Sequence, residues 1–159
     1  MGTRKESNAH GNVRAVCVSR EKGVKKQNIK IAVFKEDFGI INDAHAGSRR
    51  QVSLLAEESI VKMREKGLKV KPGDFAENIV TKGIDLKRLN TGTKIKIGKN
   101  VILEITQLGK KCLRPCAIYY KVGDCIMPRE GVFAKVFKGG IVKVKDAIQI
   151  IALKGCPIC

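Results

Sequence analysis

The sequence has few aromatic residues and no long apolar segment. Its 159 residues include no Trp, two Tyr and five Phe, whereas proteins that bind single-stranded nucleic acid use aromatic side chains as stacking platforms. No apolar run approaches the roughly 20 residues that cross a bilayer, and the polar N-terminus lacks the apolar segment of a secretory signal. We therefore expect a cytoplasmic protein without a membrane partner, and we do not expect nucleic acid as its main partner.

Acidic residues are also scarce, because 15 Asp and Glu stand against 32 Lys and Arg and the net charge is +17. Such an excess favours anionic partners, which include a phosphorylated cofactor, a nucleic acid or an acidic protein. Some of the basic residues alternate with apolar ones, as Lys94 and Lys96 do, and this pattern is typical of the solvated face of a strand. The six cysteines indicate metal or sulfur chemistry rather than disulfides, since cytoplasmic thiols are kept reduced.

The hydrophobic pattern predicts a mainly β fold with some α structure. Ser53 has the chemistry of a helix N-cap, and the helix is expected to run to about Lys66 and stop at Gly67. Gly139-Gly140 is a two-residue hairpin signal between two strands. Strands at short intervals with one main helix and short peripheral helices favour a β-barrel decorated by helices. Strands are predicted over residues 13–19, 31–34, 94–97, 101–107, 132–137, 141–144 and 147–153.

The chain shows no repeat, linker or break in composition. We therefore expect a single domain over residues 13–153, a flexible lead-in over residues 1–12 and a cysteine-containing tail over residues 154–159. A chain of this length buries a sizeable core without disulfides. Cys17 lies inside an apolar strand and is interpreted as a core residue.

Cys112 is the strongest candidate for sulfur chemistry. It follows the alternating strand VILEITQ, and the end of a strand is where a scaffold opens a reactive side chain to solvent. Lys110 and Lys111 favour its thiolate because nearby positive charge stabilises the anion. A rival interpretation is a zinc site with four thiolates, for which the ligand spacing fits Cys112, Cys116, Cys156 and Cys159.

Six segments of the chain occur in an informative order. They are SREKGVKK (19–26), DAHAG with RQVSLLAEESI (43–60), PGDFAENIVTKGI (72–84), GTKIKIG (92–98), LEITQLGKKC (103–112) and GDCIMPREGVFAKV (123–136). Together they resemble the MOSC domain family, found at the C-terminus of molybdenum-cofactor sulfurases and as small free-standing bacterial proteins. The resemblance is closest to the free-standing type. It implies a fold built around a β-barrel and a cysteine that carries or binds sulfur or metal-sulfide species.

The resemblance also assigns family positions to this chain. The family cysteine falls on Cys112, and two departures from the family pattern occur. Asn42 stands where relatives often have Gly, and Leu113 stands where they often have a His that would serve as base or metal ligand beside Cys112. The remaining family positions are the pairs Asp43 and His45, Arg50 and Gln51, Glu77 and Asn78, Asp124 and Cys125, and Arg129 and Glu130.

A persulfide on Cys112 would form by attack of its thiolate on the sulfane sulfur of a donor. Lys110, Lys111 and Arg114 are expected to favour the thiolate and to hold an anionic donor or a pterin phosphate. His45 is interpreted as a general base or a ligand, and Asp43 as its orienting partner.

Arg50 is interpreted as an anion clamp, and Asn78 as a source of neutral hydrogen bonds. Simpler interpretations stay open: Asp43 as a turn residue, His45 as a surface residue and Arg129-Glu130 as a structural ion pair. Cys125 is either structural or a second thiol near the site. The full set of candidate cofactor-binding residues is Asp43, His45, Arg50, Gln51, Glu77, Asn78, Lys110, Lys111, Arg114 and Arg129.

Three functional classes follow. The first is a sulfur carrier for molybdenum-cofactor or metal-sulfur cluster metabolism, with a cysteine-desulfurase-type donor and a molybdenum-cofactor enzyme or other acceptor. The donor is required because the chain is too short to contain a fold that binds pyridoxal phosphate. The second is a reductase-type domain that binds the molybdenum cofactor (molybdopterin) with Cys112 as the molybdenum ligand. The third is a zinc-thiolate or basic nucleic-acid-binding module.

Overall fold

The computed structural model describes residues 10–22, 24–109 and 130–152. The larger of its two sheets contains eight of the described strands, in the spatial order β11-β7-β8-β9-β5-β6-β1-β2. Their bounds along the chain are β1 His10–Val18, β2 Gln27–Asn28, β5 Val52–Ala56, β6 Ile79–Lys82, β7 Lys94–Ile97, β8 Val101–Leu108, β9 Val132–Lys138 and β11 Ala147–Ala152.

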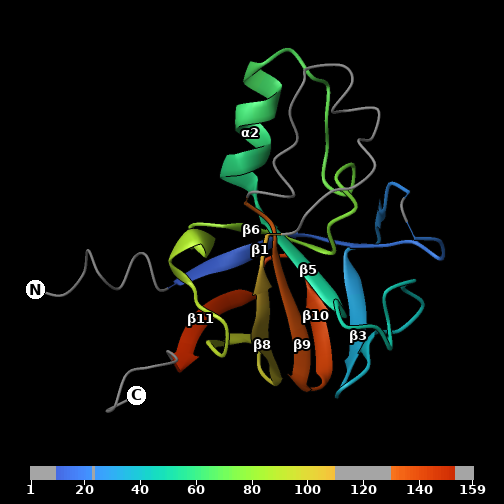
Figure 1. The fold of residues 1–159 in the computed structure, drawn as a ribbon, viewed down its shortest axis with the longest axis vertical. Coiled ribbons are helices and arrows are strands. Elements are labelled where there is room, and N and C mark those ends of the chain that lie inside the picture. The colour runs from blue at the N-terminus through green and yellow to red at the C-terminus, as the bar shows by residue number, and fades with distance from the viewer. Residues whose placement is uncertain (1–9, 23, 110–129, 153–159) are drawn as a thin grey trace, which may run out of the picture.

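The larger sheet closes into a barrel. β1 pairs with β6 and also with β11, the first strand of the order, so that these strands close on themselves, whereas β2 pairs with β1 alone. Most neighbouring strands are antiparallel, whereas β5 and β6 are parallel, with Leu54 opposite Ile79. The predicted mainly β fold built around a barrel is therefore confirmed (Figure 1).

The barrel interior is filled by every second residue of its strands. On β7, Ile95 and Ile97 are fully buried, and on β8 Val101, Leu103 and Ile105 have at most 1% of their surface exposed. Successive side chains of a strand point to opposite faces, so these residues share the inner face. The alternating apolar residues that predicted strands at 94–97 and 101–107 are thus the residues that form the core.

A second apolar cluster lies outside the barrel, beneath the helix α2 (Glu57–Glu65) that stands at one end of the barrel (Figure 1). Ile60 and Met63 of α2 pack there with Cys17 and Phe75. β1 serves both clusters because successive side chains of a strand point to opposite faces, so that Val16 lies in the barrel interior and Ala15 and Cys17 lie in this second cluster. The prediction that Cys17 is a core residue is confirmed, and burial raises the pKa of its thiol to about 12.

The smaller sheet corrects one prediction. It consists of β10 (Gly140–Lys143), β3 (Ile31–Lys35) and β4 (Gly39–Ile40), and Gly140 lies opposite Phe34 of β3. β9 instead pairs with β5 and β8 in the barrel, so Gly139-Gly140 is not the two-residue hairpin that the sequence predicted. A Cβ on Gly139 would lie 2.5 Å from the Phe34 carbonyl oxygen, so glycine is required for the close approach of two backbones.

The start of the helix is a second correction. Ser53 is not its N-cap but a buried residue of β5, where its hydroxyl contacts Asn78 Oδ1 at 3.2 Å. The N-cap position is Ala56, which makes no side-chain cap. Glu57 and Glu58 in the first turn instead complement the positive end of the helix dipole.

The other boundaries are close to the predicted ones. The helix ends at Glu65, near the predicted stop at Gly67, and the 3-10 turn η1 (Leu86–Arg88) is a short helical element of the kind expected at the periphery. β1 begins at His10, before the predicted start at Val13. Within the described ranges, no helix has the length and apolar character that crossing a bilayer requires.

Candidate functional site

The residues after β4 form consecutive turns that fix the position of His45. Asp43 Oδ2 accepts the backbone N–H of His45 at 3.1 Å, and the Ser48 N–H donates to the His45 carbonyl oxygen at 3.1 Å. An aspartate that bonds the N–H two residues later forms an Asx turn. Asn42 has φ 72°, a left-handed conformation that Gly adopts freely and Asn tolerates best among other residues. Asn42 in place of Gly therefore leaves this turn intact.

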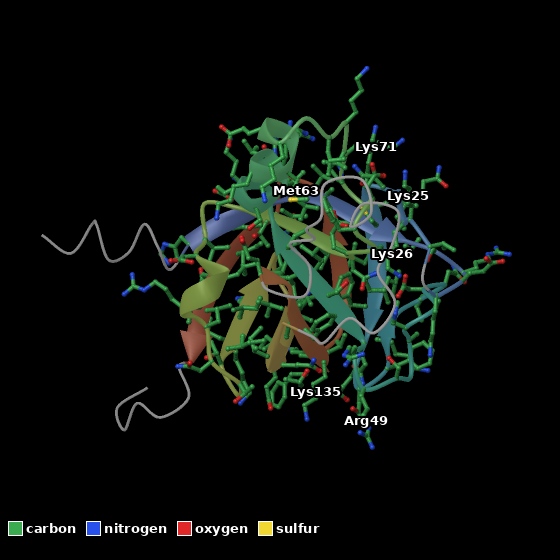
Figure 2. The ribbon with its side chains drawn as sticks, turned by 45° about the horizontal axis from the view of Figure 1, so that its top comes forward. Lys25, Lys26, Arg49, Met63, Lys71 and Lys135 are labelled. Atoms are coloured by element: carbon green, nitrogen blue, oxygen red, sulfur yellow. The ribbon has the colours of Figure 1, made fainter. Side chains whose placement is uncertain are left out.

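A buried ion pair lies behind the turn. Lys26 Nζ donates to Asp43 Oδ1 at 2.7 Å, and both side chains are fully buried. The Ser19 N–H donates to the same oxygen at 3.1 Å. Burial alone would raise the pKa of Asp43, but contacts with His45 and Lys26 outweigh it and hold the pKa below its ordinary value. The preceding residue, Lys25, is exposed to solvent (Figure 2).

The loop that follows residue 71 holds Lys26 in this position. The Lys26 N–H donates to the Gly73 carbonyl oxygen at 2.8 Å. Gly73 has φ +95°, and a Cβ there would lie 2.0 Å from the Lys26 carbonyl oxygen. The buried lysine therefore depends on a glycine nearly fifty residues away in the sequence.

Glu77 and Asn78 stabilise the same loop from inside the protein. Glu77 is fully buried and accepts the N–H groups of Gly73 at 2.8 Å and Phe75 at 3.0 Å. Its burial raises the pKa to about 7, although these N–H groups oppose the shift. Asn78 Nδ2 donates to the Cys17 carbonyl oxygen at 2.9 Å. Both side chains make hydrogen bonds within the fold, and a direct role of either in binding a ligand stays a prediction.

On the solvent side of His45 lies a cavity of about 470 Å³, which we name the His45 pocket. Arg50 Nε donates to Gln107 Oε1 at 3.1 Å, and its guanidinium lies 5.5 Å from the centre of the Phe133 ring, so Arg50 is held from two sides. Arg49 extends outward at the edge of the molecule (Figure 2). The pocket is lined by Lys22, His45, Ser48, Arg49, Arg50 and Gln107.

Gln51 does not share this pocket with Arg50. It is buried, and its Oε1 accepts the backbone N–H of Val136 at 3.0 Å. Successive residues of an extended chain point to opposite sides. The pair that the resemblance placed together is thus divided between the pocket (Arg50) and the barrel wall (Gln51).

The pocket adjoins the end of β8, where the sequence leads to Cys112. Gln107 Nε2 donates to the Gly109 carbonyl oxygen at 2.8 Å, and the Gly109 N–H donates to Gly131 at 2.6 Å. Cys112 follows Gly109 by three positions in the sequence. Several predicted site residues lie outside the described residues, namely Lys110, Lys111, Cys112, Leu113, Arg114, Cys116, Asp124, Cys125, Arg129, Cys156 and Cys159.

Glu130, the last residue of the predicted Arg-Glu pair, lies on the α2 side of the molecule. Its carboxylate accepts the Ser59 hydroxyl and lies 3.5 Å from Lys62 Nζ. These three residues line a separate cavity of about 310 Å³, which does not include His45. In the described part of the chain, no cluster of three or more His, Cys, Asp or Glu is arranged to hold a metal ion.

Five residues of the site are not among the candidates predicted from the sequence. Lys22 and Lys26 belong to the first matching segment, SREKGVKK, but neither is among the candidate residues that the sequence predicts. The segment gives no signal that one of its lysines is buried, because that burial depends on distant partners. The missed residues are Lys22, Lys26, Ser48, Arg49 and Gln107.

Comparisons with known proteins find solved structures that share this fold. The YuaD protein from Bacillus subtilis is 18% identical with a TM-score of 0.75, covering 89% of this chain and 95% of that chain. YiiM from Geobacillus stearothermophilus is 15% identical with a TM-score of 0.65, covering 89% and 75% of the two chains. YiiM from Escherichia coli is 15% identical with a TM-score of 0.62, covering 90% and 70%.

At such identities the likeness to these structures shows the fold alone. No curated protein matches the sequence. The model of the MOSC domain, however, matches residues 42–149, well over half of the chain. The protein therefore belongs to the MOSC domain family.

Proposed function

We propose that the His45 pocket binds an anionic sulfur donor and that Cys112 accepts sulfur from it as a persulfide. The observation that carries this proposal is the lining of the pocket. Lys22, Arg49 and Arg50 place three cationic side chains around His45, and no acidic residue lines the cavity among the described residues. Its volume of about 470 Å³ falls within the range of small-molecule sites.

The charge of the pocket selects the ligand class. Hydrogen bonds from arginine or lysine to an anion are about twice as strong as those between neutral groups. Arg50 suits this role because Gln107 and Phe133 hold its side chain before a ligand arrives. Pre-organisation reduces the entropy lost on binding. The favoured ligand therefore presents an anionic group to the pocket, such as the persulfide of a sulfur donor or a phosphate.

Cys112 is the proposed acceptor of the sulfur because of its position in the sequence. It follows Gly109, whose carbonyl oxygen is bonded to Gln107 of the pocket wall. In the proposed reaction the Cys112 thiolate attacks the terminal, sulfane sulfur of a donor persulfide. The sulfur–sulfur bond of the donor breaks, the donor leaves as a thiolate, and Cys112 retains the persulfide. The exchange requires no external oxidant or reductant, which fits a carrier that a cysteine-desulfurase-type donor loads.

A second candidate function rests on the same cationic lining. Lys22, Arg49 and Arg50 fit the phosphate of a molybdenum-cofactor pterin, and Cys112 would be the ligand of its metal. When bound, this group would supply redox chemistry towards a substrate. The residues of this chain would bind the phosphate and orient the pterin. Binding of the cofactor would make the protein a reductase-type domain rather than a carrier.

The experiment that tests the carrier is the intact mass of the protein after incubation with a cysteine desulfurase and cysteine. We expect a gain of about 32 Da, one sulfur atom, that dithiothreitol removes. The Cys112→Ala variant should show no gain at that site, and Cys17→Ala serves as the control because Cys17 is fully buried. A gain that persists in Cys112→Ala would contradict the proposal.

The same preparation distinguishes the alternatives. Molybdopterin retained through purification and lost in the Arg49→Gln, Arg50→Gln variant would favour the cofactor-binding domain. Stoichiometric zinc that is lost on Cys112→Ala would favour the four-thiolate site. Binding to nucleic acid that weakens steeply with salt would favour the basic module.

A further inference from the structure

The surroundings of Lys26 determine which nitrogen of His45 carries its proton. Three acceptor atoms surround the ammonium group: Asp43 Oδ1 at 2.7 Å, His45 Nδ1 at 3.2 Å and Ser19 Oγ at 3.4 Å. An ammonium group has three N–H donors and no acceptor. The Lys26 side chain is fully buried, so each donor needs a protein partner to avoid the cost of an unmade hydrogen bond. These three neighbours match the three donors.

Ser19 and Asp43 are consistent with this assignment. The Ser19 hydroxyl donates its own proton to the Glu21 carbonyl oxygen at 2.8 Å, so its oxygen is available to accept from Lys26. Asp43 Oδ2 accepts the backbone N–H of His45 at 3.1 Å, whereas it lies 3.7 Å from His45 Nδ1. At that separation the contact of Asp43 with the ring nitrogen is longer than an ordinary hydrogen bond, whereas Lys26 Nζ lies within hydrogen-bond distance of the same nitrogen at 3.2 Å.

His45 Nδ1 therefore accepts a hydrogen bond from Lys26, and a neutral imidazole has one donor and one acceptor nitrogen. The proton of the neutral ring then resides on Nε2. The two nitrogens of an imidazole point in different directions, so Nε2 faces away from the partner of Nδ1, and 28% of the His45 side chain is exposed where it lines the His45 pocket.

We propose that Lys26 is a positioning residue that fixes His45 in the Nε2–H tautomer, so that the ring donates a hydrogen bond to the ligand of the pocket. His45 then recognises an anionic oxygen or sulfur together with Lys22 and Arg50 and does not act as the general base. The role in recognition rests on the proposed function, whereas the tautomer depends only on Lys26 and its neighbours.

Nitrogen-15 NMR of the imidazole rings tests the tautomer directly. The chain has only two histidines, and His10→Ala leaves His45 as the single signal. At about pH 8.5, above the ordinary range for imidazole protonation, we expect a protonated, pyrrole-like Nε2 and an unprotonated Nδ1. A protonated Nδ1, or nearly equal shifts from averaging between tautomers, would overturn the proposal in the wild-type protein, without any variant at Lys26.

A pair of neighbouring variants tests the role of Lys26. Lys26→Met keeps the length of the side chain but removes the donor, and the two nitrogen shifts should move toward each other. Lys25→Met removes an exposed charge one residue away and should leave both shifts unchanged. Unchanged shifts in a folded Lys26→Met variant would contradict the positioning role. Should that variant not fold, Lys26→Arg, which keeps N–H donors at this position, should retain the Nε2–H tautomer, and nearly equal nitrogen shifts in a folded Lys26→Arg variant would contradict the positioning role.

A titration with inorganic phosphate separates this inference from the proposed function. If His45 donates to an anion, the Nε2–H resonance should move with phosphate concentration, and the movement should be lost in Arg50→Gln. An Nε2–H tautomer that does not respond to phosphate would contradict the role in anion recognition, whereas the positioning of the ring by Lys26 would stand.

Discussion

At the scale of single residues, the site depends on the buried ion pair of Lys26 and Asp43. The Lys26 and Asp43 side chains are both fully buried and 2.7 Å apart. Buried ion pairs contribute little net stability, but the loss of one partner leaves the other charge without compensation. The pair is therefore better understood as a device that holds His45 in one orientation than as a source of stability.

Asp43→Asn should lower the free energy of unfolding by about 3–5 kcal/mol, because the Lys26 ammonium would remain buried without a counter-charge. Urea denaturation at neutral pH measures the change. Asp37→Asn makes the same chemical change at an exposed position and should have a small effect. Similar losses in both variants would mean that the buried pair has no special energetic role.

The acid dependence of stability gives a second test of Asp43. Its folded pKa lies below the ordinary value of 3.8. The stabilisation is thus fully present above pH 3.8 and is lost as the pH falls toward the folded pKa. Asp43→Asn should lose this part of the acid dependence. An unchanged slope below about pH 4 in the variant would show that Asp43 has an ordinary pKa in the folded protein.

Glu77 should act in the opposite direction and in another pH range. Its pKa is raised from 4.5 to about 7, so the folded state holds a proton that the unfolded state releases. The free energy of unfolding should therefore fall as the pH rises between 4.5 and about 7, by up to about 1.4 kcal/mol per pH unit. Glu77→Gln should flatten this slope, measured by urea denaturation across the range. The same slope in the variant would assign the dependence to another group.

The candidate residues of the site were only partly predictable from sequence. Asp43, His45 and Arg50 were identified because the DAHAG and Arg-Gln segments match the family pattern. Lys26 was missed because its burial is decided by Asp43 and Gly73, which are distant in the sequence. No local pattern distinguishes it from Lys25, which is exposed.

At the scale of elements, the turn at residues 72–75 is the support of the site. Gly73 lies against the backbone of Lys26, accepts its N–H at 2.8 Å and donates to Glu77. One short turn therefore links the buried lysine, the buried glutamate and the barrel strand β6 that follows. A substitution in this turn is expected to disturb the His45 pocket, although none of its residues lines the pocket.

Gly73→Ala and Gly67→Ala form a matched pair that tests this support. Both glycines have φ +95°, but a Cβ on Gly73 would lie 2.0 Å from the Lys26 carbonyl oxygen, whereas nothing lies within 4 Å of a Cβ on Gly67. Gly67→Ala should cost only the backbone strain, about 1–2 kcal/mol, and Gly73→Ala clearly more. Thermal unfolding compares them. Equal losses would show that the contact with Lys26 is unimportant.

Element types were predicted well where a local pattern decides them. The strands at residues 94–97 and 101–107 follow from an alternation in which every second side chain from Ile95 to Ile97 and from Val101 to Ile105 is buried and the residues between are only half-buried. The predictions at Ser53 and Gly139-Gly140 were wrong although the local chemistry fits a helix cap and a hairpin. Ser53 instead belongs to β5, which pairs with β9, and Gly140 begins β10, which pairs with β3. Long-range strand pairing overrides such local signals.

At the scale of the whole molecule, the net charge of +17 raises the question of whether the pocket or the general surface attracts the donor. A basic surface accelerates encounters with any anion, and salt screens that effect. A specific pocket differs because only its own residues should matter. Two variants with the same total change in charge can separate these explanations.

The most direct test of one site formed by the His45 pocket and Cys112 is the rate at which Cys112 gains persulfide sulfur in two triple variants. Lys22→Gln, Arg49→Gln, Arg50→Gln removes the cations of the pocket. Lys99→Gln, Lys138→Gln, Lys145→Gln removes three exposed charges elsewhere. We predict at least about a tenfold slower gain in the pocket variant, from the loss of charge-assisted hydrogen bonds, and a rate close to wild type in the other. Equal rates in the two variants would contradict the account.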